Sequence, residues 1–460
     1  MVIRKNAKEL FLQNNRFDLI FKYIYIKNKD KKTPFFKNLY LNHIKAFNNF
    51  YEEEPSDGVE KSTPEDFVLS FDALYNSIKE KGFDKSLGII PIGTNGEISD
   101  GAHRLACACL LDTDVFIEND GRKDEYDYKF FLERGLDRKY ADYAAIEYVK
   151  MQPNAYIVNL HSVISEEFDP DVENILKEYG NIYYKKSIAL NYNGYVNLKK
   201  MSYGSFWQRE SWIGDSANSY LGAQSHAHES MGNGGDLRAY VFVCEQFDCL
   251  NEIKKRVRSL FNIGNYSIHI NDYREEALAL SQFFFNDNSI QIMNLRPFGF
   301  EDSDYDSHLM EFKNRITEEG LDINDFSIGG SSPLNILGVR KSEDIDFLYN
   351  GTKQFNDEDE NISSHDSELR YYPASKYDII YNSSYYFYYE GFKILSLEAL
   401  YSLKKKRNEK PKDIVDCKTI RKLLHKSDKL VNSKRSILIL FTVLKKYIKK
   451  IIKYILRIIK

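Results

Sequence analysis

The stretch SIGGSSPLNILGVRKSEDIDFLYN, residues 327–350, constrains the fold of this chain more than any other. It places two glycines and two serines, which favour a tight turn, shortly before two aspartates that one isoleucine separates. In a β-strand, alternation puts Asp344 and Asp346 on one face and Ile345 on the other. The stretch therefore predicts a strand with two neighbouring carboxylates, preceded by a turn with accessible backbone N–H groups.

Divalent-metal binding is the chemistry that fits two such carboxylates. Carboxylates about 6–7 Å apart on one face repel each other unless a cation lies between them. Mg²⁺, or the similar Mn²⁺, favours carboxylate oxygens together with substrate phosphates. The backbone and hydroxyls of the turn, at Gly330, Ser331 and Ser332, suit phosphate oxygens. The alternative is that Asp344 and Asp346 merely occupy the exposed face of an edge strand.

Two further residues complete the predicted site. A paired-metal site needs a third acid, and Asp378, flanked by alternating apolar residues in KYDIIY, is the candidate. Arg340, between the turn and the aspartates, is a candidate for nucleotide binding. Two metals held in this way would activate an attacking hydroxyl and stabilise a leaving pyrophosphate.

This region resembles the nucleotidyltransferase fold of the polymerase-β type. The family motif is a hydrophobic residue, Gly, then Gly or Ser, a gap of about a dozen residues, an acid–hydrophobic–acid pair and a later third acid. Here the Gly-Ser pair at 330–331 is followed by twelve residues and then by Asp344 and Asp346. The resemblance implies Mg²⁺-dependent nucleotidyl transfer from ATP or another NTP, with these aspartates as metal ligands and catalytic residues beside Asp378.

The resemblance covers about 315–425. The string LEALYSLKKKRNEKPKDIVD looks like the helical end of the family, in which a Lys/Arg-rich helix precedes an Asp pair, here Asp413 and Asp416. Two features depart from the family pattern, namely Pro333 directly after the serines and the bulky run YYFYYEG.

A second anion site is predicted in EISDGAHRLACACLL, near the N-terminus. Asp100 and Gly101 form a turn between a strand and a small, apolar helix. The N–H groups of the first helical turn, with His103 and Arg104, would form an anion pocket. The alternative is that Asp100 caps the helix, while the His and Arg side chains are solvated or ion-paired.

The same string resembles the DGxHR box of the ParB/sulfiredoxin-type fold, whose members bind nucleotides there. The resemblance implies phosphate or metal contacts by the four box residues, with His103 also catalytic. The sulfinate reductases of the family have a cysteine where this chain has Ala102, and the partition proteins continue with a basic helix-turn-helix that is not evident here. A small-molecule phosphotransferase remains, with a glutamate at 52–54 as candidate general base.

The C-terminal residues 437–460 have the spacing of a cationic amphipathic helix. Nine Lys/Arg and no acid occur in 434–460, which leaves a net charge near −13 on residues 1–433. The tail predicts peripheral contact with an anionic membrane, with docking on the acidic body or a coiled-coil partner as alternatives. An acidic body argues against general nucleic-acid binding, and no DNA partner is expected.

The middle of the chain, residues 151–305, carries no usable family resemblance. SHAHES, with His226, His228 and Glu229, lacks the HExxH spacing and is interpreted as a polar loop rather than a metal site. His269 is predicted on a strand, pointing into a site or the core. A solvated face is the favoured interpretation of the basic residues of this segment, and the alternative is that they help to hold an anionic substrate; they are Lys185, Lys186, Lys199, Lys200 and Arg209. Five cysteines without a CxxC pair indicate a reducing cytoplasm and no zinc site.

Local signals also predict individual elements. The predicted helices cover 65–81, capped by Ser62 or Thr63, then 251–261 and 273–284, and another begins in EDSDYDSHLM. Strands are predicted in AYIVNL, SIALNY, AYVFVCE and YSIHIN. From residue 386 onward we expect one strand followed by two helices, with the boundary between the helices near Pro411.

Together the patterns predict a multidomain α/β and α+β chain. Its parts are a ParB/sulfiredoxin-like nucleotide-using domain (1–150), a mixed α/β segment (151–305), a nucleotidyltransferase-like domain (306–430) and a basic amphipathic helix (434–460). The leading hypothesis is a cytoplasmic, membrane-peripheral enzyme that phosphorylates and then nucleotidyl-activates a small hydroxylated or sugar substrate, in keeping with cell-surface polysaccharide synthesis. The alternatives are a nucleotidyltransferase that modifies a protein or tRNA, and a non-catalytic nucleotide-binding scaffold.

Overall fold

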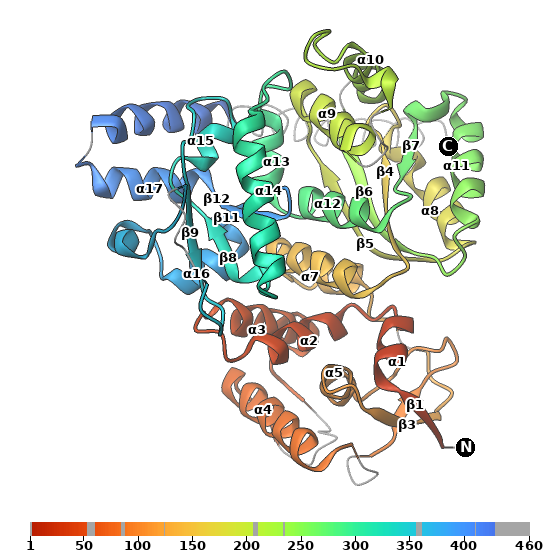
Figure 1. Cartoon of the computed structure of the whole chain (residues 1–460). Helices are drawn as coiled ribbons and strands as arrows, with labels where there is room; N and C mark the ends of the chain where they lie inside the picture. The colour runs from red at the N-terminus through yellow and green to blue at the C-terminus, as the bar shows by residue number, and fades with distance from the viewer. Residues whose placement is uncertain are drawn as a thin grey trace, which may run out of the picture.

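The computed structural model describes residues 2–52, 60–83, 88–123, 125–205, 210–232, 235–355, 361–409 and 411–427. Within them, helices surround three small sheets, and the chain is a mixed α/β protein of several parts (Figure 1). The predicted mixed α/β class is therefore confirmed at this coarse level.

The N-terminal part contains a three-stranded sheet in the order β1-β3-β2. In it, β1 (Ile3–Asn6) is antiparallel and β2 (Ile90–Ile92) is parallel to β3 (Asp114–Asn119). Its helices are α1 (Ala7–Gln13), α2 (Asp18–Asn28), α3 (Phe35–Asn48), α4 (Pro64–Lys81), α5 (Ala102–Leu110) and α6 (Tyr128–Glu133). At the start of α4, the Thr63 side chain accepts the Asp66 N–H and the Asp66 carboxylate accepts the Thr63 N–H. This capping box confirms the helix predicted there.

The middle part contains a four-stranded antiparallel sheet in the order β5-β6-β4-β7. The strands are β4 (Ala155–Leu160), β5 (Asn181–Ile188), β6 (Leu237–Val243) and β7 (Ile268–Ile270). The helices are α8 (Asp169–Lys177), α9 (Tyr192–Lys199), α10 (Leu221–Met231), α11 (Cys249–Phe261) and α12 (Arg274–Phe284). Figure 1 shows α8 and α11 on one side of this sheet and α9 and α10 on the other.

The C-terminal part contains a mixed five-stranded sheet in the order β10-β9-β8-β12-β11. The strands are β8 (Phe326–Ile328), β9 (Ile345–Tyr349), β10 (Ile362–Ser364), β11 (Tyr386–Tyr389) and β12 (Phe392–Leu395). The helices are α13 (Asp287–Leu295), α14 (Ser303–Glu318), α15 (Ser332–Ile336), α16 (Lys376–Tyr381), α17 (Leu397–Arg407) and a helix over 411–427. Strand β9 is antiparallel to β8 and parallel to β10, while β8 is parallel to β12.

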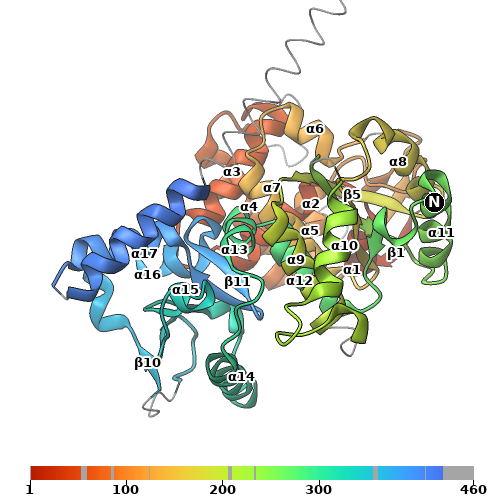
Figure 2. The ribbon, with the colours of Figure 1, turned by 90° about the horizontal axis from the view of Figure 1, so that it is seen from above.

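The two faces of this sheet differ in character. On one face, the ring of Phe312 from α14 packs against Phe326, Phe347 and Phe392, with ring centroids 5.3–5.6 Å apart. Because side chains alternate along β9, Asp346 lies on the opposite face from Phe347. Figure 2 shows α14 set apart from α16 and α17, which flank the other side of the sheet. The face with Phe347 packs against α14, and the opposite face carries Asp346 of the predicted site.

Helix α7 (Arg138–Met151) connects the three parts. Most of its residues are buried, and it packs against α2, α12 and the 3₁₀ turn Ser383–Tyr385. The Lys150 side chain donates to Asn324 Oδ1 of the C-terminal part over 3.1 Å. Helix α7 therefore contacts elements of all three parts.

The structure corrects several sequence predictions. SHAHES lies within helix α10, with His226 buried, and is not a loop. The single strand predicted after residue 386 is the hairpin β11–β12, whose two turn residues, Glu390 and Gly391, both have positive φ. SIALNY falls mostly beyond β5, which ends at Ile188.

Two lysines of the middle part differ from expectation, since Lys186 and Lys199 are buried rather than solvated. The sulfurs of Cys244 and Cys249 lie next to each other, and the three cysteines elsewhere in the described chain are free. The reducing compartment inferred from the cysteines stays a prediction.

Candidate active site

The predicted turn lies between β8 and α15, and its shape depends on Gly330. Gly330 has φ +58°, a conformation that L side chains rarely adopt. A Cβ at this position would also collide with Asp346 Oδ2, so the carboxylate lies directly on the Gly330 backbone. The preceding residue donates its N–H to the Asp346 carbonyl over 2.8 Å. The turn and the second aspartate are therefore held together as one unit.

Hydroxyl groups connect the turn to the first aspartate. The Ser342 hydroxyl donates to the Asp344 carbonyl at 2.8 Å and lies 2.7 Å from Ser331 Oγ. Because Ser342 uses its proton on that carbonyl, Ser331 is the donor of the pair. Ser332, the first residue of α15, is fully buried, and Asn335 of that helix accepts the Ser342 N–H. The backbone before Asp344 is thus fixed by the same short helix that follows the turn.

The two carboxylates lie in different environments, and Asp344 precedes β9, which begins at Ile345. Asp344 is exposed, whereas Asp346 is half-buried in β9. Burial, with the charge of Asp344, raises the pKa of Asp346, against the opposing effects of His365, Arg407 and Lys404. The Asp346 carboxylate thus lies near the negative charge of Asp344 and the positive charges of Arg407 and Lys404.

His365 is the neighbour of Asp346 that the sequence analysis missed. In the parallel pair β9–β10, Ser363 lies opposite Asp346, and His365 follows two residues later on the same face. Its N–H donates to the Phe347 carbonyl over 2.8 Å, which continues the ladder, and its Nδ1 lies 2.8 Å from the Tyr372 hydroxyl. Burial lowers the pKa of His365, while Asp346 acts in the opposite direction.

Asp378 does not take the position beside these residues. It lies in the first turn of helix α16, although the apolar residues that flank it in KYDIIY alternate. One carboxylate oxygen accepts the Thr33 hydroxyl at 2.6 Å and the other accepts the Ser375 hydroxyl at 2.9 Å. Its visible role is to cap α16 and to connect that helix to the N-terminal part, and its assignment as a third catalytic acid stays a prediction.

The basic helix α17 brings cations toward Asp346. Lys404 and Arg407 are 2% and 8% exposed. Arg407 forms two bonds of 2.7–3.0 Å with the Asp413 carboxylate, and Lys404 lies 2.8 Å from Asp416. The hydrogen bonds to Asp413 keep the pKa of Arg407 above its ordinary range. Asp413 and Asp416 therefore neutralise the positive charges of Arg407 and Lys404 on α17.

Arg340, the predicted nucleotide ligand, belongs to the same network. Its guanidinium lies 3.3 Å from Asp416 Oδ2, and 30% of its side chain is exposed. It thus stands at the edge of the charged cluster, with part of its surface open to a ligand.

The fit of a divalent metal can be judged from the donor set. Among the residues that the structure describes, no group of three or more His, Cys, Asp or Glu side chains is arranged to hold a metal ion. Asp344 and Asp346 supply carboxylate oxygens, the ligands that Mg²⁺ prefers, and Mg²⁺ ordinarily completes its octahedron with water and substrate phosphates. The two aspartates are ligands of the type that fits Mg²⁺, and they supply at most two of its six positions, with one oxygen each.

The N-terminal box is built around Arg104. Its guanidinium lies 3.2 Å from the Asp100 carboxylate and packs against the backbone of Gly88 and Gly101. Gly101 is the N-cap of α5 with φ +80°, so this position, and not Asp100, starts the helix. Asp100, Gly101 and Arg104 lie together at the start of α5, and the Asp and Arg side chains bond each other.

His103, by contrast, points inward. Its Nε2 lies 2.9 Å from the Tyr40 hydroxyl, and its ring meets the edge of Phe71 at a centroid distance of 4.6 Å. Burial, with the charge of Lys22 and the neighbouring His43, holds the pKa of His103 well below its ordinary value of 6.5. The half-buried ring is thus held between two aromatic side chains, and a catalytic role for it stays a prediction.

A charged network lies beneath this box. Asp18 is fully buried and accepts two bonds of 2.9 Å from Arg16 and one of 2.6 Å from Lys22. Among the predicted general bases, Glu52 lies 3.0 Å from the Lys61 amine. The other two, at 53–54, lie outside the described residues.

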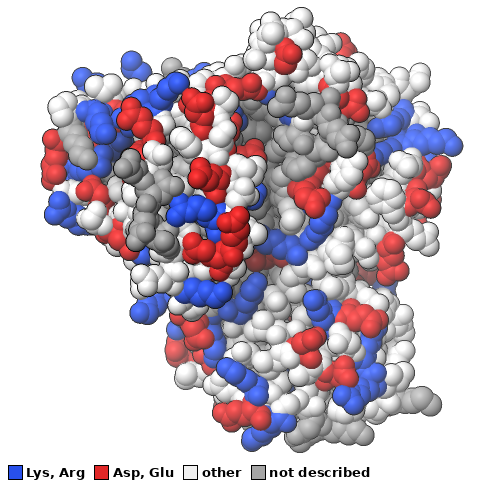
Figure 3. All heavy atoms as spheres, viewed as in Figure 1, with Lys and Arg blue, Asp and Glu red and all other residues white. Residues whose placement is uncertain are grey.

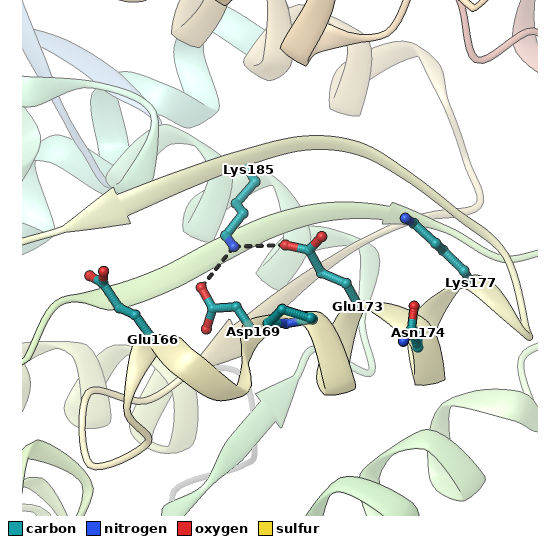
Figure 4. A pocket seen from close by; sticks show the side chains of 7 residues that line it. Glu166, Asp169, Glu173, Asn174, Lys177 and Lys185 are labelled. Carbon is teal, nitrogen blue, oxygen red and sulfur yellow. Dashed lines mark hydrogen bonds and ion pairs between the residues drawn. The ribbon is translucent and has the colours of Figure 1, made fainter. Parts of the chain in front are cut away.

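Charges elsewhere on the surface are mixed. Figure 3 shows Lys and Arg interspersed with Asp and Glu over the described residues of one face. A surface pocket beside α8 is lined by Glu166, Asp169, Pro170, Glu173, Asn174, Lys177 and Lys185. In it, the Lys185 amine lies 2.7 Å from each of the Asp169 and Glu173 carboxylates (Figure 4). Because that cation is already neutralised, we assign no function to this pocket.

The predicted membrane-binding segment, 437–460, lies outside the described residues. In the described part of the chain, none of the helices combines the length and the apolar character that crossing a bilayer requires.

Comparisons of this chain with protein-family models, with curated proteins and with solved structures find no match.

Proposed function

We propose that this chain is a Mg²⁺-dependent nucleotidyltransferase whose active site is the face that carries Asp344 and Asp346. The observation that carries the proposal is the contact between the Asp346 carboxylate and the backbone of Gly330. Around this contact lie the Gly330 turn, the two aspartates and the basic helix α17, whose Lys404 and Arg407 are paired with Asp416 and Asp413. This combination suits a nucleoside triphosphate, whose phosphates need both donors and counter-charge.

The reaction follows from the groups that surround this contact. An acceptor hydroxyl attacks the α-phosphorus of the NTP, a new P–O bond forms, and the bond to the β-phosphate oxygen breaks to release pyrophosphate. Bound Mg²⁺ would neutralise charge on the phosphates and orient the attacking oxygen. The turn at Gly330 and Ser331 binds phosphate oxygens, and Asp344 and Asp346 position the ion. The hydroxyl proton passes to His365, which lies on the same face as Asp346.

The test measures pyrophosphate released by the full chain with each NTP, Mg²⁺ and a pool of small hydroxylated acceptors. We expect Asp344→Asn and Asp346→Asn to lower the rate by at least about 100-fold, the range seen when electrostatic stabilisation is removed. Asp304→Asn is the matched control, because Asp304 is exposed on α14, across the sheet, and the change in charge is the same. Equal rates in all four proteins would show that the aspartates have no part in turnover.

The acceptor class separates the alternatives. A small hydroxylated or sugar acceptor fits a role in cell-surface polysaccharide synthesis, whereas label transferred from NTP to protein or tRNA would support a modifying enzyme. NTP binding without pyrophosphate release, unchanged in Asp344→Asn, would support a scaffold.

For the N-terminal box we propose nucleotide binding, supported by the cluster of Asp100, Gly101 and Arg104 at the start of α5. A kinase-type step there predicts NDP release that His103→Ala abolishes.

The cytoplasmic, membrane-peripheral location belongs to the same proposal and predicts that deletion of 434–460 releases the protein from anionic vesicles.

A further inference from the structure

The middle part contains a cluster of buried polar side chains that neither proposed site uses. It occupies the face of the β4–β7 sheet that α9, α10 and the π-helical turn Lys200–Ser205 cover. Its members are Asn159, His161, Lys199, Ser202, His226 and His269, each 0–8% exposed. Asn159 lies opposite His269 in the antiparallel pair β4–β7, and His161 follows it on the same face.

Lys199 is the unusual member, because its buried amine has no acidic partner in the part of the chain that the structure describes. Its Nζ lies 3.0 Å from His161 Nε2, while His161 Nδ1 donates to the Tyr266 carbonyl at 3.0 Å. His161 is therefore a neutral acceptor that brings no negative charge. No carboxylate among the described residues forms an ion pair with Lys199. Burial alone lowers the pKa of Lys199 well below its ordinary value.

The nearby carboxylate is already engaged. Glu276 of α12 is fully buried, and its Oε1 lies 2.6 Å from His269 Nε2. The cluster therefore contains one paired acid and one unpaired amine. An uncompensated buried cation is costly to a fold unless a ligand or a function requires it.

Two further side chains in the cluster lack hydrogen-bond partners. Asn159 is 1% exposed, and neither its Oδ1 nor its Nδ2 is bonded in the described structure. Ser202 is also 1% exposed, with an unbonded Oγ. Buried amides and hydroxyls are nearly always satisfied, so unsatisfied groups around an unpaired lysine point to a missing ligand.

An aromatic shell separates the cluster from solvent. Trp212 stacks on His226 at a centroid distance of 5.4 Å, and Tyr203 and Tyr266 meet the same ring at 5.6 and 4.9 Å. Trp212 is 41% exposed and Tyr266 36% exposed, so the rings reach from the buried polar groups to the surface. They offer an apolar wall for the rest of a bound molecule.

We propose that this cluster is a ligand site that binds a phosphate group of a small molecule through Lys199, Asn159 and Ser202. The three groups come from a strand, a helix end and a π-helical turn on one buried face, and three separate donors suit the tetrahedral oxygens of phosphate better than the two oxygens of a carboxylate. The anion supplies the counter-charge that Lys199 lacks. The remainder of the molecule lies against Trp212 and Tyr266.

The probe is inorganic phosphate, with acetate as the carboxylate comparison, at constant ionic strength and with the full chain. Calorimetry measures the Kd, and thermal unfolding measures the rise in Tm with phosphate concentration that a ligand of the folded state produces. We expect Lys199→Met and Asn159→Leu to weaken phosphate binding by about 10-fold or more, because each removes a buried donor. Phosphate should bind more tightly than acetate.

Lys177→Met is the matched control. Lys177 is exposed on α8 of the same part, and the substitution changes the charge equally. Phosphate bound at the Gly330 turn or the Asp100 box would remain in every variant, so a loss specific to Lys199→Met and Asn159→Leu assigns the site. The proposal is wrong if phosphate binds all four proteins equally, binds none of them, or binds no better than acetate.

Discussion

The Asp346 carboxylate rests on the backbone of Gly330, and no side chain fits between them. This contact couples the turn after β8 to strand β9 through space, in addition to the hydrogen bond from the Gly329 N–H to the Asp346 carbonyl. Any residue larger than glycine must move the carboxylate or the turn. The geometry therefore makes Gly330 as important for the proposed site as the aspartates themselves.

Gly330→Ala should lower both stability and nucleotidyl transfer. The positive φ costs about 1 kcal/mol for alanine, and the collision with Asp346 adds to it, so we expect a loss of about 2–3 kcal/mol in the free energy of unfolding. Gly320→Ala is the matched control, because Gly320 has φ +61° but only the flexible Lys353 amine nearby. Denaturant unfolding and pyrophosphate release measure the two effects. Equal losses of stability in the two variants would show that the Asp346 contact contributes nothing.

The features that the sequence predicted correctly are local ones. The capping box of Thr63 and Asp66 fixes the start of α4 within four residues. The alternation around Asp346 likewise needs only its neighbours along β9. In each case the physical cause lies within one turn or one strand, so a single sequence is sufficient to show it.

The features that it missed depend on contacts between distant segments. His365 reaches Asp346 only because β10 pairs in parallel with β9, and no local pattern indicates that pairing. Asp378 lies in a short apolar run that suits a strand or a helix equally, and the Ser375 cap decides for the helix. His226 is buried because α10 packs over the sheet, which the polar string SHAHES does not suggest. Gly391 is a turn residue that indicates the β11–β12 hairpin, but the continuous aromatic run before it suggests a single strand.

Asp18 should be essential for the N-terminal part. Burial opposes its charge, but Arg16 and Lys22 hold the pKa of Asp18 far below its ordinary value of 3.8. Asp18→Asn leaves two buried cations without a counter-ion, and we expect a loss of about 3–5 kcal/mol in the free energy of unfolding. Because the folded pKa is lowered, the contribution of Asp18 is present above pH 3.8 and lost as the pH falls below it. The difference between wild type and Asp18→Asn should shrink across that range in urea unfolding curves, and a constant difference would contradict the assignment.

His103 should contribute to stability through its packing. His103→Ala removes a half-buried ring that contacts Tyr40 and Phe71, and we expect a loss of about 1–2 kcal/mol in the free energy of unfolding. Tyr40→Phe removes only the hydroxyl that bonds this ring and should lose about 1 kcal/mol. NTP binding, measured by calorimetry, separates the two interpretations. A loss of NTP affinity in His103→Ala at a temperature where the variant is folded, with Tyr40→Phe unchanged, would show that the histidine contacts nucleotide.

Lys199 and Lys186 should respond in opposite directions to the same substitution. Lys186 is buried like Lys199, but its amine lies 2.7 Å from both Asp142 and Asp287. Lys186→Met leaves Asp142 buried without its cation and should lose about 3 kcal/mol or more in the free energy of unfolding. Lys199→Met removes an unpaired buried amine and, without ligand, should gain about 0.5–2 kcal/mol, as changes at functional sites often do.

The pH dependence of that gain follows from the lowered pKa of Lys199. Between the folded pKa and the ordinary value of 10.5, the unfolded chain binds more protons at this position than the folded chain, so Lys199 makes wild-type stability rise with pH in that window. Lys199→Met lacks this rise, and its advantage over wild type should therefore be greatest at low pH and fall as the pH approaches 10.5. Chemical unfolding of the two proteins at several pH values in parallel measures the difference. A Lys199→Met variant that is less stable than wild type at neutral pH, without added phosphate, would mean that Lys199 already has a stabilising partner in the folded chain.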